Sequence, residues 1–269
     1  PDGVLAGMAA GSVLIDNTTA SAIVARELDA AAKAKGIGFL DAPVSGGTGA
    51  PSITLNVLPG VGSATFYYQA LEGASGSVGM TATATGFTNG VATTTIVQPG
   101  IELVSVPTST TTLSPNSAFY AQVGLPNGQL TALQRVQNLR GNAPGPLTVT
   151  VTSASPAVGT IVDSVNGPAG GATGTARIPS GRYYTGTSGP ASGGVAFRPL
   201  STGTSAISVA APGFLTMSNG NRSVTVTQPV LSISAGFAQV GQGLIESGSV
   251  SMSASNHGGA SVTLTSRNP

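Results

Sequence analysis

The sequence has no cysteine, no tryptophan and a single histidine among its 269 residues. The absence of cysteine excludes disulfides, thiolate metal sites and cysteine nucleophiles. Charged residues make up 7% of the chain, whereas an average protein has about 25%. A net charge of +1 gives too weak a field to hold nucleic acid, so we expect no nucleic-acid partner. No apolar run approaches the roughly 18 residues of a membrane span, so we expect none.

The residues that are present indicate a folded, β-rich chain. Hydrophobic residues make up 40% of the sequence, and 39 residues are glycine. Apolar residues alternate with threonine or serine in LTVTVT (147–152), AISVA (206–210) and SVTVT (223–227). This period of two is typical of half-buried strands. Clusters of Gly, Pro, Asn and Ser separate these runs, which predicts many short strands in a β-sandwich or barrel.

The first 50 residues have a different pattern. An apolar stripe at helical spacing predicts one helix over residues 19–36, and Gly36 suits its left-handed end. Apolar runs at 12–16 and 37–44 predict a strand on each side of this helix. A strand, a helix and a strand of these lengths predict a parallel crossover. Both lysines of the chain lie in this segment, which indicates an origin different from that of the remainder.

The sequence after residue 50 contains an internal repeat. Gln-Pro pairs occur at 98/99 and at 228/229, and similar sequence surrounds both of them. Similarity on both sides of a shared anchor indicates a repeat. We therefore predict a fragment at 1–50, the last part of one repeat at 51–98, a complete repeat at 99–228 and the first part of another at 229–269.

Two segments carry a resemblance for the region after residue 50. PLSTGTSAISVAAPGF (199–214) and SVTVTQP (223–229) resemble the immunoglobulin-like repeats of very large bacterial surface proteins. The fold class predicted for the chain is mainly β: immunoglobulin-like β-sandwich repeats with a short N-terminal βαβ-like segment. The resemblance implies a bacterial protein at the cell surface or outside the cell. The chain begins at Pro1 without a visible signal peptide.

A different resemblance applies to the first 50 residues. The run DAPVSGG (41–47) is similar to the substrate-binding signature of the 3-hydroxyisobutyrate dehydrogenase family. The resemblance implies that Ser45, Gly46 and Gly47 contact a substrate carboxylate through hydroxyl and backbone donors. It also implies that Thr19 touches the nicotinamide nucleotide. Glycines fit this role because they let the backbone approach an anion closely.

Other parts of that family are absent from the sequence. No GxGxxG turn occurs, although GVGSAT (60–65) and GQGLIE (241–246) begin like one. The family's catalytic lysine follows the signature, but no lysine follows Lys35. We therefore expect no cofactor and no dehydrogenase activity, and we interpret the chain as a chimera of two unrelated pieces.

Little else in the sequence indicates chemistry. His257, in SNHGG, is a weak catalytic candidate that we interpret as a turn residue. We expect no metal site, because carboxylates are few and scattered after residue 50. Asp163 and Glu102 are expected to be solvated or paired with arginine.

The sequence-based hypothesis is a non-enzymatic structural or adhesive repeat protein, such as a stalk, a filament subunit or a cell-surface segment. It would self-associate, with strands of one chain completing a partial repeat of another. One alternative is a promiscuous hydrolase from a chimeric gene. The other is a carbohydrate-binding module, for which the pairs Tyr67/Tyr68 and Tyr183/Tyr184 are candidate platforms.

Overall fold

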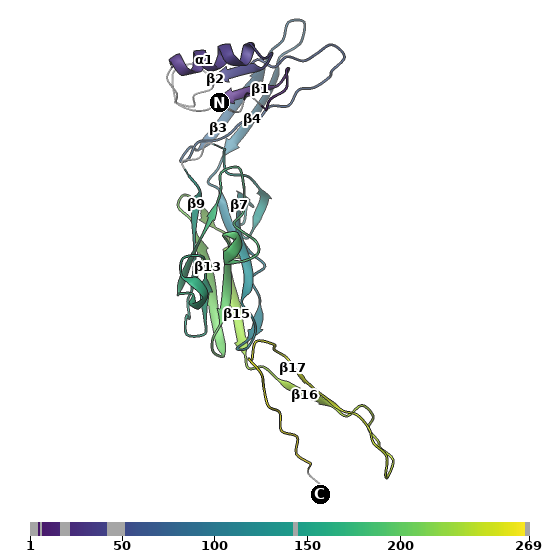
Figure 1. The fold of residues 1–269 in the computed structure, drawn as a ribbon. Helices are drawn as coiled ribbons and strands as arrows, with labels where there is room; N and C mark the ends of the chain where they lie inside the picture. The colour runs from purple at the N-terminus through teal and green to yellow at the C-terminus, as the bar shows by residue number, and fades with distance from the viewer. Residues whose placement is uncertain (1–4, 6, 17–21, 42–51, 142–144, 267–269) are drawn as a thin grey trace. The chain divides into compact units, whose positions relative to one another are not determined.

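A computed structural model of the chain describes residues 5, 7–16, 22–41, 52–141 and 145–266. The chain divides into two compact units, residues 1–74 and residues 75–269 (Figure 1). The predicted boundaries at residues 50, 98 and 228 lie within these units, and the four-part division stays a prediction. Among the described residues, no helix is long and apolar enough to cross a membrane.

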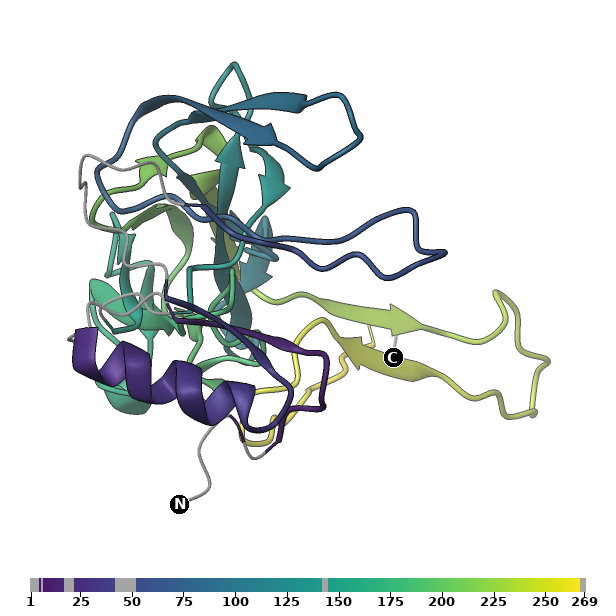
Figure 2. The ribbon, with the colours of Figure 1, turned by 90° about the horizontal axis from the view of Figure 1, so that it is seen from above.

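The first unit contains a small βαβ arrangement. Strand β1 (Val13–Asp16) is followed by helix α1 (Ala22–Lys33) and strand β2 (Gly38–Asp41). Strands β1 and β2 pair in parallel, as the sequence predicts. Figure 2 shows α1 lying along this strand pair.

The second unit contains two larger sheets. The first has the strand order β10-β12-β7-β5-β14, and β8 also pairs with β7. Its strands are β5 (Gly100–Val104), β7 (Ser117–Pro126), β8 (Leu133–Val136), β10 (Gly159–Val162), β12 (Val195–Pro199) and β14 (Leu215–Thr216). The second has the order β11-β9-β13-β15-β6. Its strands are β6 (Ser109–Thr111), β9 (Leu147–Ser153), β11 (Thr173–Ile178), β13 (Gly203–Ala210) and β15 (Asn221–Thr227). Short 3-10 helices lie at 167–169, 190–192 and 218–220.

One apolar core joins these two sheets. The first sheet contributes Phe119 and Phe197, and the second contributes Val149, Ile207 and Val224, all with no exposed surface. The alternating burial along β9 and β15 places valines inward and threonines outward. The period of two in the sequence therefore reports which face of each strand is buried.

Two further hairpins belong to the second unit. Strand β3 (Gly76–Ala82) pairs with β4 (Gly90–Ile96), and β16 (Leu231–Ser234) pairs with β17 (Ser249–Met252), both antiparallel. Figure 2 shows the β16–β17 hairpin as a two-stranded ribbon. Most of its apolar side chains are exposed, including Ile233 at 70% and Ile245 at 95%. Isolated hairpins of two strands are marginally stable in water.

Both carboxylates of residues 99–228 are buried and bonded to neutral donors, which corrects the expectation that they are solvated or paired with arginine. Glu102 is 7% exposed and Asp163 is 1% exposed. The Glu102 carboxylate accepts hydrogen bonds from Gln122 Nε2 at 2.7 Å and from the N–H of Leu133 at 3.1 Å. It thereby connects β5 to β7 and to the start of β8.

Asp163 fastens the turn that follows β10 to strand β11. Its carboxylate accepts the backbone N–H groups of Val165, Asn166 and Thr175. Burial acts to raise the pKa of Asp163, but hydrogen bonds from Asn166, Thr175 and Val165 outweigh burial and lower it. The ionised carboxylate is therefore a structural acceptor.

We expect Asp163→Asn to lower the free energy of unfolding by about 2 kcal/mol at neutral pH, because it turns a donor toward N–H groups that need an acceptor. The folded-state pKa is depressed, so the stabilisation is complete above the unfolded pKa of about 3.9 and is lost as the pH falls through the folded value. Urea unfolding at neutral and acid pH measures both effects. The matched control is Glu246→Gln, at an exposed carboxylate. A constant difference between wild type and Asp163→Asn at all pH values would contradict the assignment.

Candidate functional site

The parallel pairing of β1 and β2 brings two chain segments to one edge of a sheet. Val13 lies opposite Gly38, and Asp16 lies opposite Asp41, so both strands end at the same level. In parallel α/β sheets, ligands bind outside the carboxyl ends of the strands. At this edge β1 ends at Asp16 and β2 ends at Asp41. The edge is therefore the candidate site of the first unit.

The C-terminal end of α1 sets how the chain enters β2. The N–H of Ile37 donates to the carbonyl of Ala32 at 2.9 Å, and the N–H of Gly36 donates to that of Lys33 at 3.0 Å. Gly36 has a φ of 67°. This pair of bonds around a left-handed residue is a Schellman motif, and burial of both Ile37 and Ala32 accompanies it. The predicted helix end at Gly36 is confirmed.

Hydrogen bonds also hold β2 beside β1. The N–H of Gly38 donates to the carbonyl of Ser12, and the N–H of Gly11 donates to the carbonyl of Gly36, both at 2.8 Å. On the helix, Lys33 Nζ contacts Asp29 Oδ2 at 2.8 Å across one turn. This exposed ion pair contributes a few tenths of a kcal/mol.

The residues that the sequence singled out here, Thr19, Ser45, Gly46 and Gly47, lie outside the described residues. The structure places the strand ends that lead into them, and both ends lie at one edge.

The hydrogen bond of His257 is local and does not belong to a catalytic triad. Its Nδ1 accepts the N–H of Gly259 at 3.1 Å, within the same turn. This contact involves neither a serine nor a carboxylate, so it gives the imidazole no nucleophile to activate. The residue lies in a bend of the chain, and its interpretation as a turn residue stays a prediction.

No metal centre is present in the part of the chain that the structure describes, where no three His, Cys, Asp or Glu side chains gather. The tyrosines around Tyr184 do not form a flat platform. The ring of Tyr184 meets Tyr120 at 69° and Tyr183 at 62°. Sugars stack on a broad aromatic face, whereas these rings pack edge to face.

Comparisons with known proteins find relatives of the N-terminal segment. Residues 1–84 match the family model for the NAD binding domain of 6-phosphogluconate dehydrogenase. An uncharacterized oxidoreductase of Shewanella frigidimarina is 52% identical over 65 residues, which are 24% of this chain and 22% of that protein. The NAD-dependent L-serine dehydrogenase of Pseudomonas aeruginosa is 45% identical over 60 residues, 22% of this chain and 20% of that enzyme.

A third relative agrees with these. The 2-(hydroxymethyl)glutarate dehydrogenase of Eubacterium barkeri is 42% identical over 67 residues, which are 24% of this chain and 22% of that enzyme. The chain thus spans about a fifth of the length of the curated relatives it matches. The N-terminal segment matches the NAD-binding domain of dehydrogenases of the 3-hydroxyisobutyrate and 6-phosphogluconate type.

These matches overturn the predicted function. The predicted function was wrong, because the N-terminal region resembles NAD-dependent dehydrogenases. This applies to the non-enzymatic structural or adhesive protein and to the filament subunit. It applies equally to the two alternatives, a hydrolase and a carbohydrate-binding module. The absent Gly-rich turn and the absent later lysine favoured a non-enzymatic function, whereas the run DAPVSGG favours the dehydrogenase resemblance. The cell-surface localisation stays a prediction.

We expect Gly36→Ala to lower the free energy of local opening of the turn between α1 and β2 by about 1 kcal/mol, because a positive φ is unfavourable for alanine. Its Cβ would also lie 3.4 Å from the Cβ of Ala10. Faster hydrogen exchange of the Ile37 amide, about fivefold, is the measurement. Gly62→Ala is the matched control, since nothing lies within 4 Å of its Cβ. Equal exchange in both variants would contradict the assignment.

Proposed function

We propose that the first unit is the part of an NAD-dependent oxidoreductase that binds the nicotinamide end of the cofactor and the carboxylate of a small hydroxy acid. The observation that carries this proposal is the pairing of β1 with β2, whose carboxyl ends lead into Thr19 and into the run Ser45–Gly47. The match of residues 1–84 to an NAD-binding domain supports it. We therefore propose NAD as the cofactor, whereas the sequence analysis expected none.

The chain's own residues have separate tasks in this proposal. The Ser45 hydroxyl and the backbone N–H groups of Gly46 and Gly47 donate to the substrate carboxylate and fix its orientation. Backbone donors suit this task because they cost no side-chain entropy and approach an anion closely. Thr19, after the other strand, positions the nicotinamide nucleotide. Bound NAD supplies the hydride acceptor.

The described residues fit this arrangement in their backbone. A strand, a helix and a parallel strand form half of a mononucleotide-binding unit. The Schellman motif at Gly36 fixes the direction in which the chain enters β2. The sequence contains no Gly-rich GxGxxG turn for a pyrophosphate. The proposal therefore assigns the first unit the nicotinamide and substrate side of the site.

The test is ligand binding to the full chain, measured by saturation-transfer NMR with nicotinamide mononucleotide, NAD and 3-hydroxyisobutyrate as probes. We expect binding of the mononucleotide and of the hydroxy acid. Ser45→Ala should weaken hydroxy-acid binding about tenfold to a hundredfold, the effect of one lost hydrogen bond to a charged group. It should leave nucleotide binding unchanged.

Ser52→Ala is the matched control, because Ser52 is exposed and follows the same segment. Binding that is equally strong in Ser45→Ala and Ser52→Ala would remove the substrate-carboxylate role. No saturation transfer to either nucleotide probe would overturn the proposal as a whole.

We also propose that residues 99–228 form an immunoglobulin-like β-sandwich, and that both hairpins are parts of further copies. The strand positions support this when the Gln-Pro pair at 98/99 is aligned with the pair at 228/229. In that alignment β4 corresponds to residues 220–226, which nearly coincide with β15 (Asn221–Thr227). Likewise β16 falls on 101–104, and β5 is Gly100–Val104. This proposal concerns the fold alone, and an experimentally determined strand order decides it.

Self-association is a further proposal about partners. The exposed apolar side chains of the β16–β17 hairpin and its loop support it, since contiguous exposed apolar surface marks interaction sites. Phe237 is 73% exposed, Leu244 is 74% exposed and Ile245 is 95% exposed. Carbohydrate binding and the cell-surface localisation have no comparable support and stay predictions.

Light scattering coupled to size-exclusion chromatography measures this association. We expect a mass that is a multiple of 26.1 kDa, and Ile245→Lys should shift the mass toward the monomer because it places a charge on the contact surface. Val165→Lys is the matched control, since Val165 is 78% exposed and lies outside the hairpin. A wild-type monomer at all concentrations would refute self-association.

A further inference from the structure

Arg222 occupies a position of β15 that would be apolar in a regular sandwich. Val224 and Val226 on the same strand are buried at 0% and 2% exposure. Arg222 precedes them by two and four positions and therefore lies on the same face of the strand. Its partner across the sheet is Ile207, which has no exposed surface. Arg222 therefore extends from the same face of β15 as the buried valines. It lies at the start of the strand, where this face is exposed.

No group of the described chain neutralises this arginine. Arg222 takes part in no ion pair or side-chain hydrogen bond among the described residues. Residues 99–228 contain six arginines and two carboxylates, so positive charge is in excess. Glu102 and Asp163, the two carboxylates, are already bonded to neutral donors. An anion from solution can therefore approach Arg222 without competition from this part of the chain.

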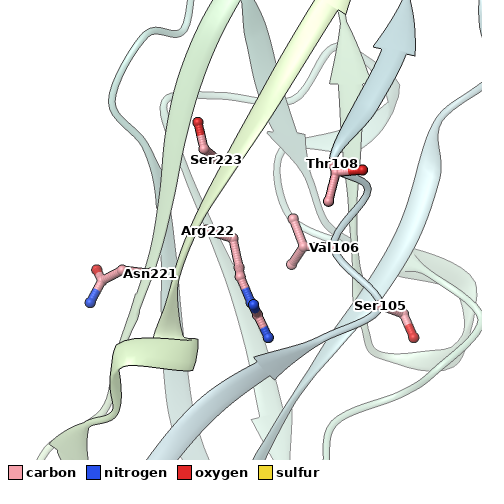
Figure 3. A pocket seen from close by; sticks show the side chains of 6 residues that line it. All are labelled: Ser105, Val106, Thr108, Asn221, Arg222 and Ser223. Atoms are coloured by element: carbon pink, nitrogen blue, oxygen red, sulfur yellow. The ribbon is translucent and has the colours of Figure 1, made fainter. Parts of the chain in front are cut away.

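A pocket of about 370 Å³ opens at this guanidinium. It lies where the chain leaves β5 and crosses to β6 in the other sheet, and its lining is Ser105, Val106, Thr108, Asn221, Arg222 and Ser223. Figure 3 shows the side chains of Arg222 and Val106 directed toward the same space, with Asn221 and Ser223 turned away.

The pocket's wall on the β5 side is held by an unusual backbone. Ser105 has a φ of 62°, a left-handed conformation that a serine adopts at some cost. The next residues lead to Thr108, whose carbonyl accepts the N–H of Thr225 at 3.0 Å. This bond begins the β6–β15 pairing. The crossover at Ser105–Thr108 and the start of β15 thus line the same pocket.

We propose that this pocket binds a small organic anion, with a carboxylate or a phosphate on Arg222 and an apolar part against Val106. The rigid fork of guanidinium N–H donors suits the paired oxygens of such a group. Pockets for small ligands begin at about 300 Å³, so this one falls at the lower end of their range. The proposal is independent of the nucleotide and substrate binding assigned to the first unit.

The experiment is a titration of the full chain with butyrate and with inorganic phosphate, observed by NMR at the Arg222 side chain and the Val106 methyl groups. We expect saturable shifts with a Kd in the range of about 0.1–10 mM. Stronger binding of butyrate would identify a carboxylate ligand, and stronger binding of phosphate would identify a phosphate ligand. Both results support the site.

Two variants and a control complete the test. Arg222→Gln should weaken binding at least about tenfold, and Arg222→Lys should keep part of it, because the charge remains while the fork of donors is lost. Arg177→Gln is the matched control, since Arg177 lies exposed on β11. Circular dichroism verifies that each variant is folded. Absence of saturable shifts with both probes, or equal affinity in Arg222→Gln and Arg177→Gln, would overturn the proposal.

Discussion

The apolar core between the two sheets of residues 99–228 is the interaction on which the second unit depends. Phe119, Phe197 and Ile207 have no exposed surface, and burial of such side chains contributes about 1.5–3 kcal/mol each. A polar group buried at the margin of an apolar core needs a hydrogen-bond partner, because burial without one costs free energy. Asp163 meets this demand with backbone N–H groups. Arg222, at the exposed end of β15, has no protein counter-charge, which makes its pocket a candidate site.

The first unit depends on a different constraint, the parallel pairing of two short strands. Because parallel strands carry their carboxyl ends to one edge, Asp16 and Asp41 end their strands side by side. The Schellman motif at Gly36 determines the direction in which β2 leaves the helix. Nucleotide and hydroxy-acid binding at this edge would follow from backbone geometry, whereas the site at Arg222 would follow from an uncompensated side-chain charge.

The dehydrogenase resemblance of the N-terminal segment rests on a run of residues that is specific by itself. A run such as DAPVSGG requires several glycines and polar residues in a fixed order, so it is specific. The absence of a GxGxxG turn and of a later lysine does not remove the resemblance that this run carries. The resemblance of residues 41–47 was seen in the sequence, and the function drawn from the whole chain was nevertheless wrong.

The sequence by itself determined the local elements: the helix end at Gly36, the strands around it, and the alternating strands such as β9 and β15. These follow from periodicity and from glycine's backbone freedom, which act between near neighbours. Only the tertiary structure decided that Glu102 and Asp163 are buried, and that Arg222 has no counter-charge while facing Val106. Burial and hydrogen bonding depend on residues that are distant along the chain, such as Glu102 and Asn219. Sequence spacing carries no record of those contacts, because packing of the two sheets creates them.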